Sequence, residues 1–136
     1  MEIPQISEDA NVVGVGIDQI EVSRIRESIK RHGNTFLNKV FTADERAFCM
    51  ERADPAPCLA ARFALKEAVS KALGTGIGKE FGWLDVEVKK EENGKPVAQF
   101  SAHGLKALHH IGGKSAFISL SHLQEVACAI AVLVKK

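Results

Sequence analysis

Residues 62–76 (RFALKEAVSKALGTG) carry a high density of charge for a segment so rich in alanine. At helical spacing Glu67 and Lys71 share one face, and Arg62 and Lys66 likewise lie four residues apart. Such a set could bind a polyanion together with a metal ion. Alternatively, it forms i,i+4 salt bridges on a solvated helix face, each contributing about 0.2–0.5 kcal/mol. Spacing alone does not decide between these two interpretations.

Asp18 offers a second carboxylate. It ends the glycine-rich run VVGVGID (residues 12–18), where small residues allow a ligand or another backbone to approach closely. The alternative is an ordinary turn aspartate at a strand end. Together with Glu67 it would supply two hard oxygen ligands, and magnesium typically takes one or two carboxylates plus water and phosphate oxygens. The pair predicts a diphosphate–magnesium site, and no His/Cys cluster has the spacing of a zinc site.

Two other features allow both a structural and a functional interpretation. The run Gly74-Thr75-Gly76 predicts either a helix C-cap with a turn, or a nest of backbone amides for a phosphate. We expect His122, in the run SLSH, to make a hydrogen bond or to contact a phosphate. Ser119 and Ser121 beside it suggest a Ser–His hydrolase. However, the chain has no G-x-S-x-G elbow, and a triad is recognised by geometry rather than by adjacency.

Hydrophobic periodicity predicts the elements that would position these residues. In chain order they are a buried strand over 12–18, helices over 22–33, 42–53 and 57–73, strands over 84–90 and 97–102 joined at an Asn-Gly turn, a short helix over 103–113, and strands over 116–122 and 126–134. Thr42 and Glu45 match a capping box, and Gly33 and Gly74 are expected to end their helices. This order predicts an α+β fold with a small, mostly antiparallel sheet packed with helices.

Composition indicates a soluble globular protein of 136 residues, 46% hydrophobic, with a net charge of +1. We expect one domain over 12–136, preceded by a flexible extension over 1–11. Near neutrality argues against a bulk electrostatic grip on nucleic acid or membrane, and no apolar run reaches the ~20 residues of a membrane span. The polar, acidic start predicts no signal peptide. Three cysteines without C-x-x-C spacing, with Cys128 expected as a buried thiol, favour a reducing cytoplasm.

Read in order, several motifs resemble the holo-acyl-carrier-protein synthase family. They are G-I-D with Arg24 six residues on, F-T-A-D-E, R-F-A-L-K-E-A-V-S-K-A-L-G-T-G, N-G-K-P and S-L-S-H, and they span residues 14–122. The resemblance implies magnesium-dependent transfer of 4′-phosphopantetheine from coenzyme A to a serine of acyl carrier protein, in support of fatty acid biosynthesis. It also implies an α+β fold and homotrimers with active sites between subunits.

By the same resemblance, Asp18 and Glu67 look like the magnesium ligands and Lys71 like the lysine that contacts the transferring phosphate. These three are the expected catalytic residues. The general base is left open between Glu67, reached through a metal-associated water, and Asp18.

The resemblance also implies the contacts to coenzyme A and to the carrier. They are Arg62 and His122 at the phosphates with Ser121 beside them, Gly74 along the pyrophosphate, Asn93, Gly94, Lys95 and Pro96 along the adenine edge, and Arg24 at the acidic carrier protein. Leu123 departs from the polar or acidic residue that is common after the histidine.

Two other classes of function remain open at this point. One is a coenzyme A-binding or nucleotide-binding module without catalysis. The other is a structural trimer in which the run VACAIAVLV (126–134), apolar on both faces, forms the interface.

Overall fold

The computed structural model describes residues 11–90 and 93–135, so most of the expected extension over 1–11 lies outside the described residues. The elements are β1 (Val12–Glu21), α1 (Val22–His32), α2 (Asn34–Val40), α3 (Ala43–Met50), α4 (Ala56–Leu73), the 3₁₀ helix η1 (Trp83–Asp85), β2 (Val86–Lys90), β3 (Pro96–Phe100), α5 (Ala102–His110), β4 (Ser115–His122) and β5 (Val126–Val134). None of the helices in these ranges is long and apolar enough to cross a membrane.

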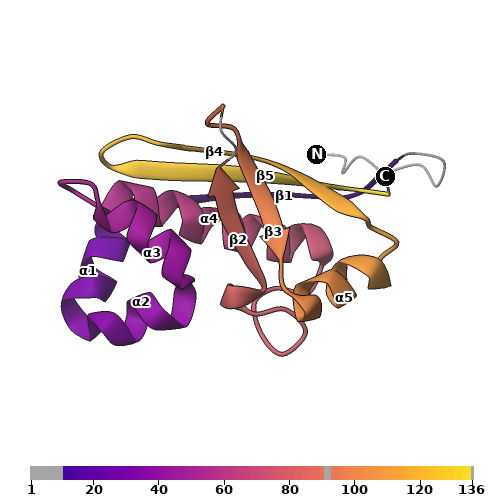
Figure 1. Ribbon diagram of the computed structural model, residues 1–136, viewed down its shortest axis with the longest axis horizontal. Helices are drawn as coiled ribbons and strands as arrows, with labels where there is room; N and C mark the ends of the chain where they lie inside the picture. The colour runs from indigo at the N-terminus through magenta and orange to yellow at the C-terminus, as the bar shows by residue number, and fades with distance from the viewer. Residues whose placement is uncertain (1–10, 91–92, 136) are drawn as a thin grey trace, which may run out of the picture.

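The strands form two antiparallel sheets rather than the single small sheet expected. One has the order β1-β5-β4, and the other is the hairpin β2-β3. In Figure 1 the three long strands run across the top, the hairpin crosses them steeply, and α1 to α3 gather at one end. The α+β class is confirmed.

The long helix α4 is the centre of the core. It packs against the inner faces of β1 and β5, and nearly all of its residues are buried. This burial explains its alanine content, because small side chains let the helix lie close to the sheet on one side and to α1 and α3 on the other.

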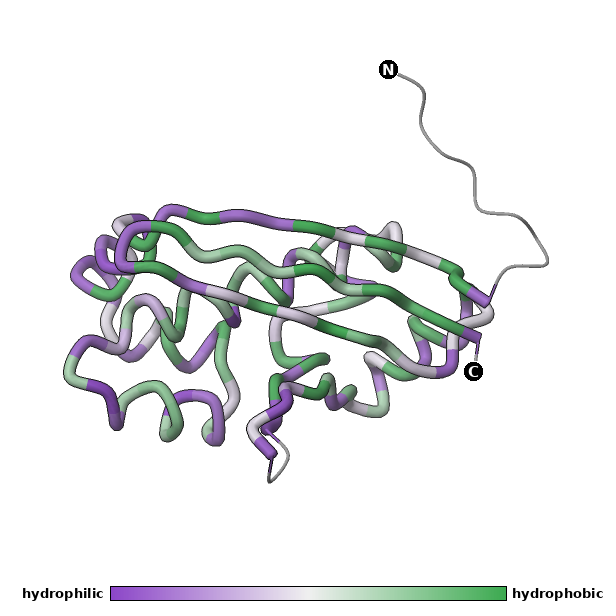
Figure 2. The backbone as a smooth tube through the Cα atoms, turned by 90° about the horizontal axis from the view of Figure 1, so that it is seen from above, coloured by the Kyte–Doolittle hydropathy of each residue, from purple (hydrophilic) through white to green (hydrophobic). Residues whose placement is uncertain are grey.

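The outer face of the three-stranded sheet is apolar and exposed. Val15, Ile17 and Phe117 have exposed fractions of 52%, 67% and 61%, and Ile130 joins them. Figure 2 shows the three strands side by side with hydrophobic segments along each. The expectation of a buried strand over 12–18 holds for one face only, because Val15 and Ile17 on the other face of β1 are exposed. Cys128 points to the same outer side and is exposed, contrary to the expected buried thiol.

Most local predictions for the helices are confirmed. Thr42 and Glu45 form the capping box of α3, with both reciprocal hydrogen bonds present. Gly33 and Gly74 have φ angles of +52° and +80° at the ends of α1 and α4, conformations that favour glycine. The helix α2 was not predicted, since its seven residues are too few to display a clear period.

Cys49 and Cys58 form a disulfide between the end of α3 and the start of α4. Both side chains are buried. The bond joins the two helices across the loop 51–55, and the sequence spacing alone did not indicate it.

Candidate active site

Asp18 of β1 and Lys71 of α4 form the centre of the candidate site. The Lys71 Nζ atom lies 2.7 Å from Asp18 Oδ1 and 3.5 Å from the carbonyl oxygen of Ile17. The Asp18 side chain is largely buried, with 17% exposed, whereas that of Lys71 is 52% exposed. The Lys71 ammonium can therefore turn toward a ligand while the side chain stays beside Asp18.

Two glycines explain how the strand and the helix come this close. A Cβ atom on Gly14 would collide with the carbonyl oxygen of Ala72, and one on Gly16 would collide with that of Ala68. Two residues of β1 and four residues of α4 each span about 6 Å along their axes. Every second residue of β1 therefore meets α4 about one helical turn further along. The next inward residue of β1, Asp18, therefore falls beside the turn of α4 that carries Glu67.

Glu67 adds the second carboxylate. Burial raises the pKa of Glu67 above its usual range, and the negative charge of Asp18 raises it further, whereas Lys71 lowers it. Glu67 is therefore close enough to Asp18 for the charge of Asp18 to act on it. The described residues contain no group of three or more His, Cys, Asp or Glu side chains able to hold a metal. Two carboxylates fit magnesium, which keeps water and substrate phosphate in its remaining positions.

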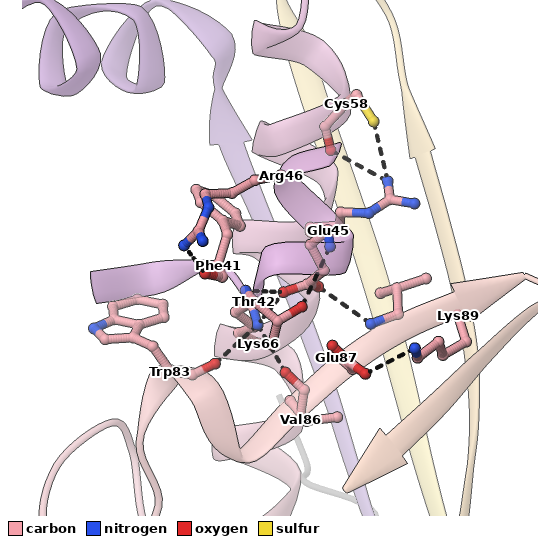
Figure 3. A network of polar contacts seen from close by, with 12 residues as sticks. Phe41, Thr42, Glu45, Arg46, Cys58, Lys66, Trp83, Val86, Glu87 and Lys89 are labelled. Atoms are coloured by element: carbon pink, nitrogen blue, oxygen red, sulfur yellow. Dashed lines mark hydrogen bonds and ion pairs between the residues drawn. The ribbon is translucent and has the colours of Figure 1, made fainter. Parts of the chain in front are cut away.

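Lys66 does not belong to this site, which corrects the interpretation of residues 62–71 as one charged set. Its Nζ atom lies 2.8 Å from Glu45 Oε1 and donates to the carbonyl oxygens of Trp83 and Val86 (Figure 3). The second oxygen of Glu45 accepts from the Val88 amide. Both charged side chains are fully buried, and the network ties α3, α4 and β2 together.

Arg62 lies in a separate basic cluster, made of Arg52, Arg62, Lys90 and His122. The cationic ends of Arg52, Arg62 and Lys90 lie 4.8, 4.6 and 5.3 Å from the centre of the Phe48 ring. Burial lowers the pKa of His122, and the positive charges of these three residues lower it further. Arg62 is 4% exposed, and its buried Nε atom has no hydrogen-bond partner among residues 11–90 and 93–135.

Arg52 and Lys90 were not predicted from the sequence. They come from the α3–α4 loop and the end of β2, and no motif connects them to Arg62 or to His122. Only the packing of four separate segments brings the cluster together.

The reaction centre and the basic cluster occupy different faces of α4. At 100° per residue, Arg62 and Glu67 project roughly 140° apart around the helix axis. Arg62 faces Cys58 and Phe48, whereas Lys71 faces β1. The predicted i,i+4 pairing along this helix is absent from the ion pairs of the described residues, where Lys71 and Lys66 each bind a carboxylate from another element.

The Gly74-Thr75-Gly76 run is a helix C-cap. The amide of Gly74 donates to the carbonyls of Lys71 and Ser70, and those of Thr75 and Gly76 donate to Ser70. The three amides are thus used within the turn, which does not support the amide-nest interpretation.

The remaining predicted residues lie at three places: the turn between β2 and β3 with the start of β3, the end of β4, and α1. Asn93 and Gly94 form the turn between β2 and β3, where Asn93 Oδ1 accepts from the amide of Lys95, and Pro96 begins β3. Ser121 and His122 end β4 and are exposed, as is Leu123. Arg24 lies on the exposed side of α1 and lines a shallow groove with Glu27, Ser28, Arg31 and His32.

Comparison with known proteins gives consistent results. A model of the 4′-phosphopantetheinyl transferase superfamily matches residues 14–131. The holo-[acyl-carrier-protein] synthase of Chlamydia pneumoniae is 46% identical over 121 residues, covering 89% of this chain and 96% of that protein. The protein of the same name from Protochlamydia amoebophila is 45% identical over 120 residues, covering 88% and 96%.

Two solved structures extend the comparison to the fold. Holo-[acyl-carrier-protein] synthase of Helicobacter pylori, in complex with coenzyme A, superposes with a TM-score of 0.78 at 33% identity, covering 88% of this chain and 98% of that one. A holo-(acyl-carrier-protein) synthase from Bacillus anthracis, in complex with CoA (3′,5′-ADP), superposes with a TM-score of 0.77 at 36% identity, covering 93% and 100%.

Proposed function

We infer the function from one premise: the chain belongs to the 4′-phosphopantetheinyl transferase superfamily, among the holo-[acyl-carrier-protein] synthases. It transfers the 4′-phosphopantetheine group of coenzyme A to a serine of apo acyl carrier protein. The products are holo acyl carrier protein, which supports fatty acid biosynthesis, and adenosine 3′,5′-bisphosphate. The single observation that best carries this function on the chain itself is the contact of Lys71 with Asp18 beside Glu67.

We propose that Asp18 and Glu67 hold Mg²⁺, which when bound supplies charge neutralisation and polarisation of the pyrophosphate. Lys71 then turns its half-exposed ammonium from Asp18 to the oxygens of the transferring phosphate. Phosphoryl transfer depends mainly on positioning and charge stabilisation, which these side chains are suited to provide. Glu67 is our first choice as proton acceptor for the attacking serine, since burial raises its pKa above the usual range of a glutamate.

We assign the basic cluster to the 3′-phosphate of coenzyme A. Coenzyme A carries a pyrophosphate and one further phosphate, the 3′-phosphomonoester on its ribose. The pyrophosphate belongs at the reaction centre, so Arg52, Arg62, Lys90 and His122 remain for the 3′-phosphate. The orphan Nε atom of Arg62 supports this assignment, because a buried donor without a partner is costly unless a ligand satisfies it. Asn93, Gly94, Lys95 and Pro96 stay predicted contacts of the adenine, Ser121 of the nearby phosphate and Gly74 of the pyrophosphate.

We further propose a homotrimer in which one coenzyme A bridges two subunits. The reaction centre and the basic cluster lie on different faces of α4, so a neighbouring copy can supply the second half of each site. The apolar outer face of the β1-β5-β4 sheet supports such assembly. Ile17, Ile130 and the backbone of Ser119 lie in one cross-strand row, and Val15, Val132 and Phe117 lie in another. Exposed apolar patches of this kind typically mark protein interfaces.

We also propose residues 12–136 as one catalytic domain, Arg24 as a carrier-protein contact and the cytoplasm as the location. The Cys49–Cys58 bond is the one observation that does not favour a reducing compartment. Neither an inert coenzyme A-binding module nor a structural trimer requires Asp18, Glu67 and Lys71 to lie together.

Mass spectrometry of apo acyl carrier protein tests the proposed function. The carrier is incubated with coenzyme A, Mg²⁺ and the purified chain. A mass gain equal to one phosphopantetheine on the carrier is expected, together with release of adenosine 3′,5′-bisphosphate. An unchanged carrier with coenzyme A still bound by the chain would favour the binding module instead.

A further inference from the structure

Phe48 stands at the centre of the basic cluster without being charged itself. Its half-buried ring, on α3, has three cationic groups within 5.3 Å of its centre. These groups come from the α3–α4 loop, from α4 and from the end of β2. All three cations therefore meet at the face of this ring.

No acidic side chain in the described part of the chain forms a salt bridge with any of the three cations, Arg52, Arg62 and Lys90. Glu45 acts on Arg62 through its charge, but its carboxylate is already bound by Lys66, Thr42 and Val88. Three like charges around one ring repel each other, and a bound anion would offset this repulsion.

We propose that Phe48 is a positioning residue whose ring holds Arg52, Arg62 and Lys90 together as one phosphate-binding cluster, and so sets the preference for a donor with a 3′-phosphomonoester. This inference rests on the proposed function, since it takes coenzyme A as the donor and the basic cluster as its 3′-phosphate site.

An aromatic ring suits this task better than a carboxylate would. The face of the ring attracts cations through its quadrupole, which orients long side chains that would otherwise sample many rotamers. A carboxylate would orient them more strongly, but it would also neutralise them and repel the phosphate. The ring adds no charge, so the full positive potential stays available to the ligand.

Steady-state kinetics with two donors test the inference. Coenzyme A and 3′-dephospho-coenzyme A differ only in the phosphate that the basic cluster is proposed to bind. In Phe48→Leu, KM for coenzyme A is expected to rise about tenfold, in line with the loss of several cation–π contacts. KM for 3′-dephospho-coenzyme A and kcat with either donor are expected to change less than about twofold. Phe48→Tyr, which keeps the ring, is expected to retain the wild-type preference.

Phe36→Leu is the matched control, because Phe36 packs against Phe41 and Phe63 and is not among the rings that face a cation. It is expected to leave the ratio of the two KM values unchanged. If Phe48→Leu proves unstable, Phe48→Met serves as the second variant, with its folding checked by circular dichroism. Equal rises of both KM values in a folded Phe48 variant, or no rise in either, would overturn the inference.

The same data separate this inference from the function on which it rests. A wild-type protein that transfers phosphopantetheine but does not distinguish the two donors would contradict the 3′-phosphate assignment, and the inference with it. A wild-type protein that discriminates strongly, with Phe48→Leu discriminating equally well, would leave the proposed function intact and reject the role of Phe48. No transfer from either donor would reject the proposed function itself.

Discussion

Lys66 and Lys71 lie five residues apart on α4, but the Lys66 ammonium is fully buried against Glu45 whereas that of Lys71 is half exposed against Asp18. At 100° per residue their side chains project roughly 140° apart, toward α3 and toward β1. Lys66 therefore stabilises the fold, whereas Lys71 belongs to the candidate active site.

This contrast predicts opposite results for two equivalent substitutions. Lys66→Met should lower the free energy of unfolding by about 3–5 kcal/mol, because it leaves Glu45 charged and unpaired in the interior. Lys71→Met should stay folded but lower kcat by about 100-fold or more, through loss of a donor to the transferring phosphate. Urea unfolding and transfer assays of both variants provide the check. Equal losses of stability in the two variants would contradict the assignment of Lys66 to the fold and of Lys71 to the active site.

The helices and strands that carry the site were largely predictable from sequence. Val22 and Ile25 keep a helical period, Thr42 and Glu45 match a capping box, and Gly74 marks the end of α4. Asp18, Glu67 and Lys71 were singled out by spacing and ligand chemistry, and their roles came from the motif resemblance. The packing of Gly14 and Gly16 against α4 gives the physical reason that they meet.

What the sequence could not show is which face of an element is covered. Lys66 reads as an exposed charge in a helical pattern, and only the position of Glu45 on α3 makes its burial possible. Val15 and Ile17 read as core residues, but their side chains lie exposed on the outer side of the strand. Arg52 and Lys90 join the basic cluster through long-range contacts that no local pattern encodes.

A pH-dependent contribution to stability is expected from Asp85. Its carboxylate accepts hydrogen bonds from Ser101 Oγ and the Gly82 amide, and His103 Nδ1 lies 2.8 Å away. Burial acts to raise the pKa of Asp85, but His103, Ser101 and Gly82 outweigh it and hold the pKa below the usual range of an aspartate. A carboxyl with a lower pKa in the folded state stabilises the protein above its unfolded pKa, and this contribution is lost as the pH falls through the folded pKa.

Asp85→Asn should accordingly lower the free energy of unfolding by about 1.5–3 kcal/mol at pH 7, the scale of hydrogen bonds to a charged group. The difference from wild type should shrink as the pH falls from the usual pKa range of an aspartate through the lowered pKa of Asp85. Denaturant titrations between neutral and acidic pH measure both quantities. Asp44→Asn, which removes only an exposed pair with Lys89, is the control and should change stability little. A difference that stays constant with pH would contradict the assignment to this carboxylate.

Assembly can be tested through the outer face of the sheet. Light scattering at micromolar concentration should report about three chains for the wild type. Ile130→Asp places a charge within this apolar face and should shift the mass toward the monomer, with loss of transfer activity. Leu84→Asp, a charge at an exposed apolar residue of η1, should leave the mass unchanged. A fully active monomer would exclude a site shared between subunits.

Carrier docking is expected to depend on Arg24. This residue has no salt bridge within the described part of the chain, whereas Arg26 is paired with Asp54 and Arg31 with Glu27. Arg24→Glu should raise KM for the carrier and weaken its salt dependence, since rim charges act mainly on association, and KM for coenzyme A should change little. Kinetics against both substrates at two ionic strengths give the result. Arg26→Glu is the matched charge reversal on the same helix. A change in KM for coenzyme A caused by Arg24→Glu would place Arg24 in another part of the site.

Transfer is expected to depend on a magnesium ion held by Asp18 and Glu67, and the transfer rate as a function of Mg²⁺ concentration measures this dependence. Wild-type activity should disappear with a chelator and return when Mg²⁺ is added. Asp18→Asn and Glu67→Gln should stay folded and be slower by about 100-fold or more at every Mg²⁺ concentration, because the ion supplies several kcal/mol of charge stabilisation. Full activity of either folded variant, or an undiminished wild-type rate in chelator, would contradict the account.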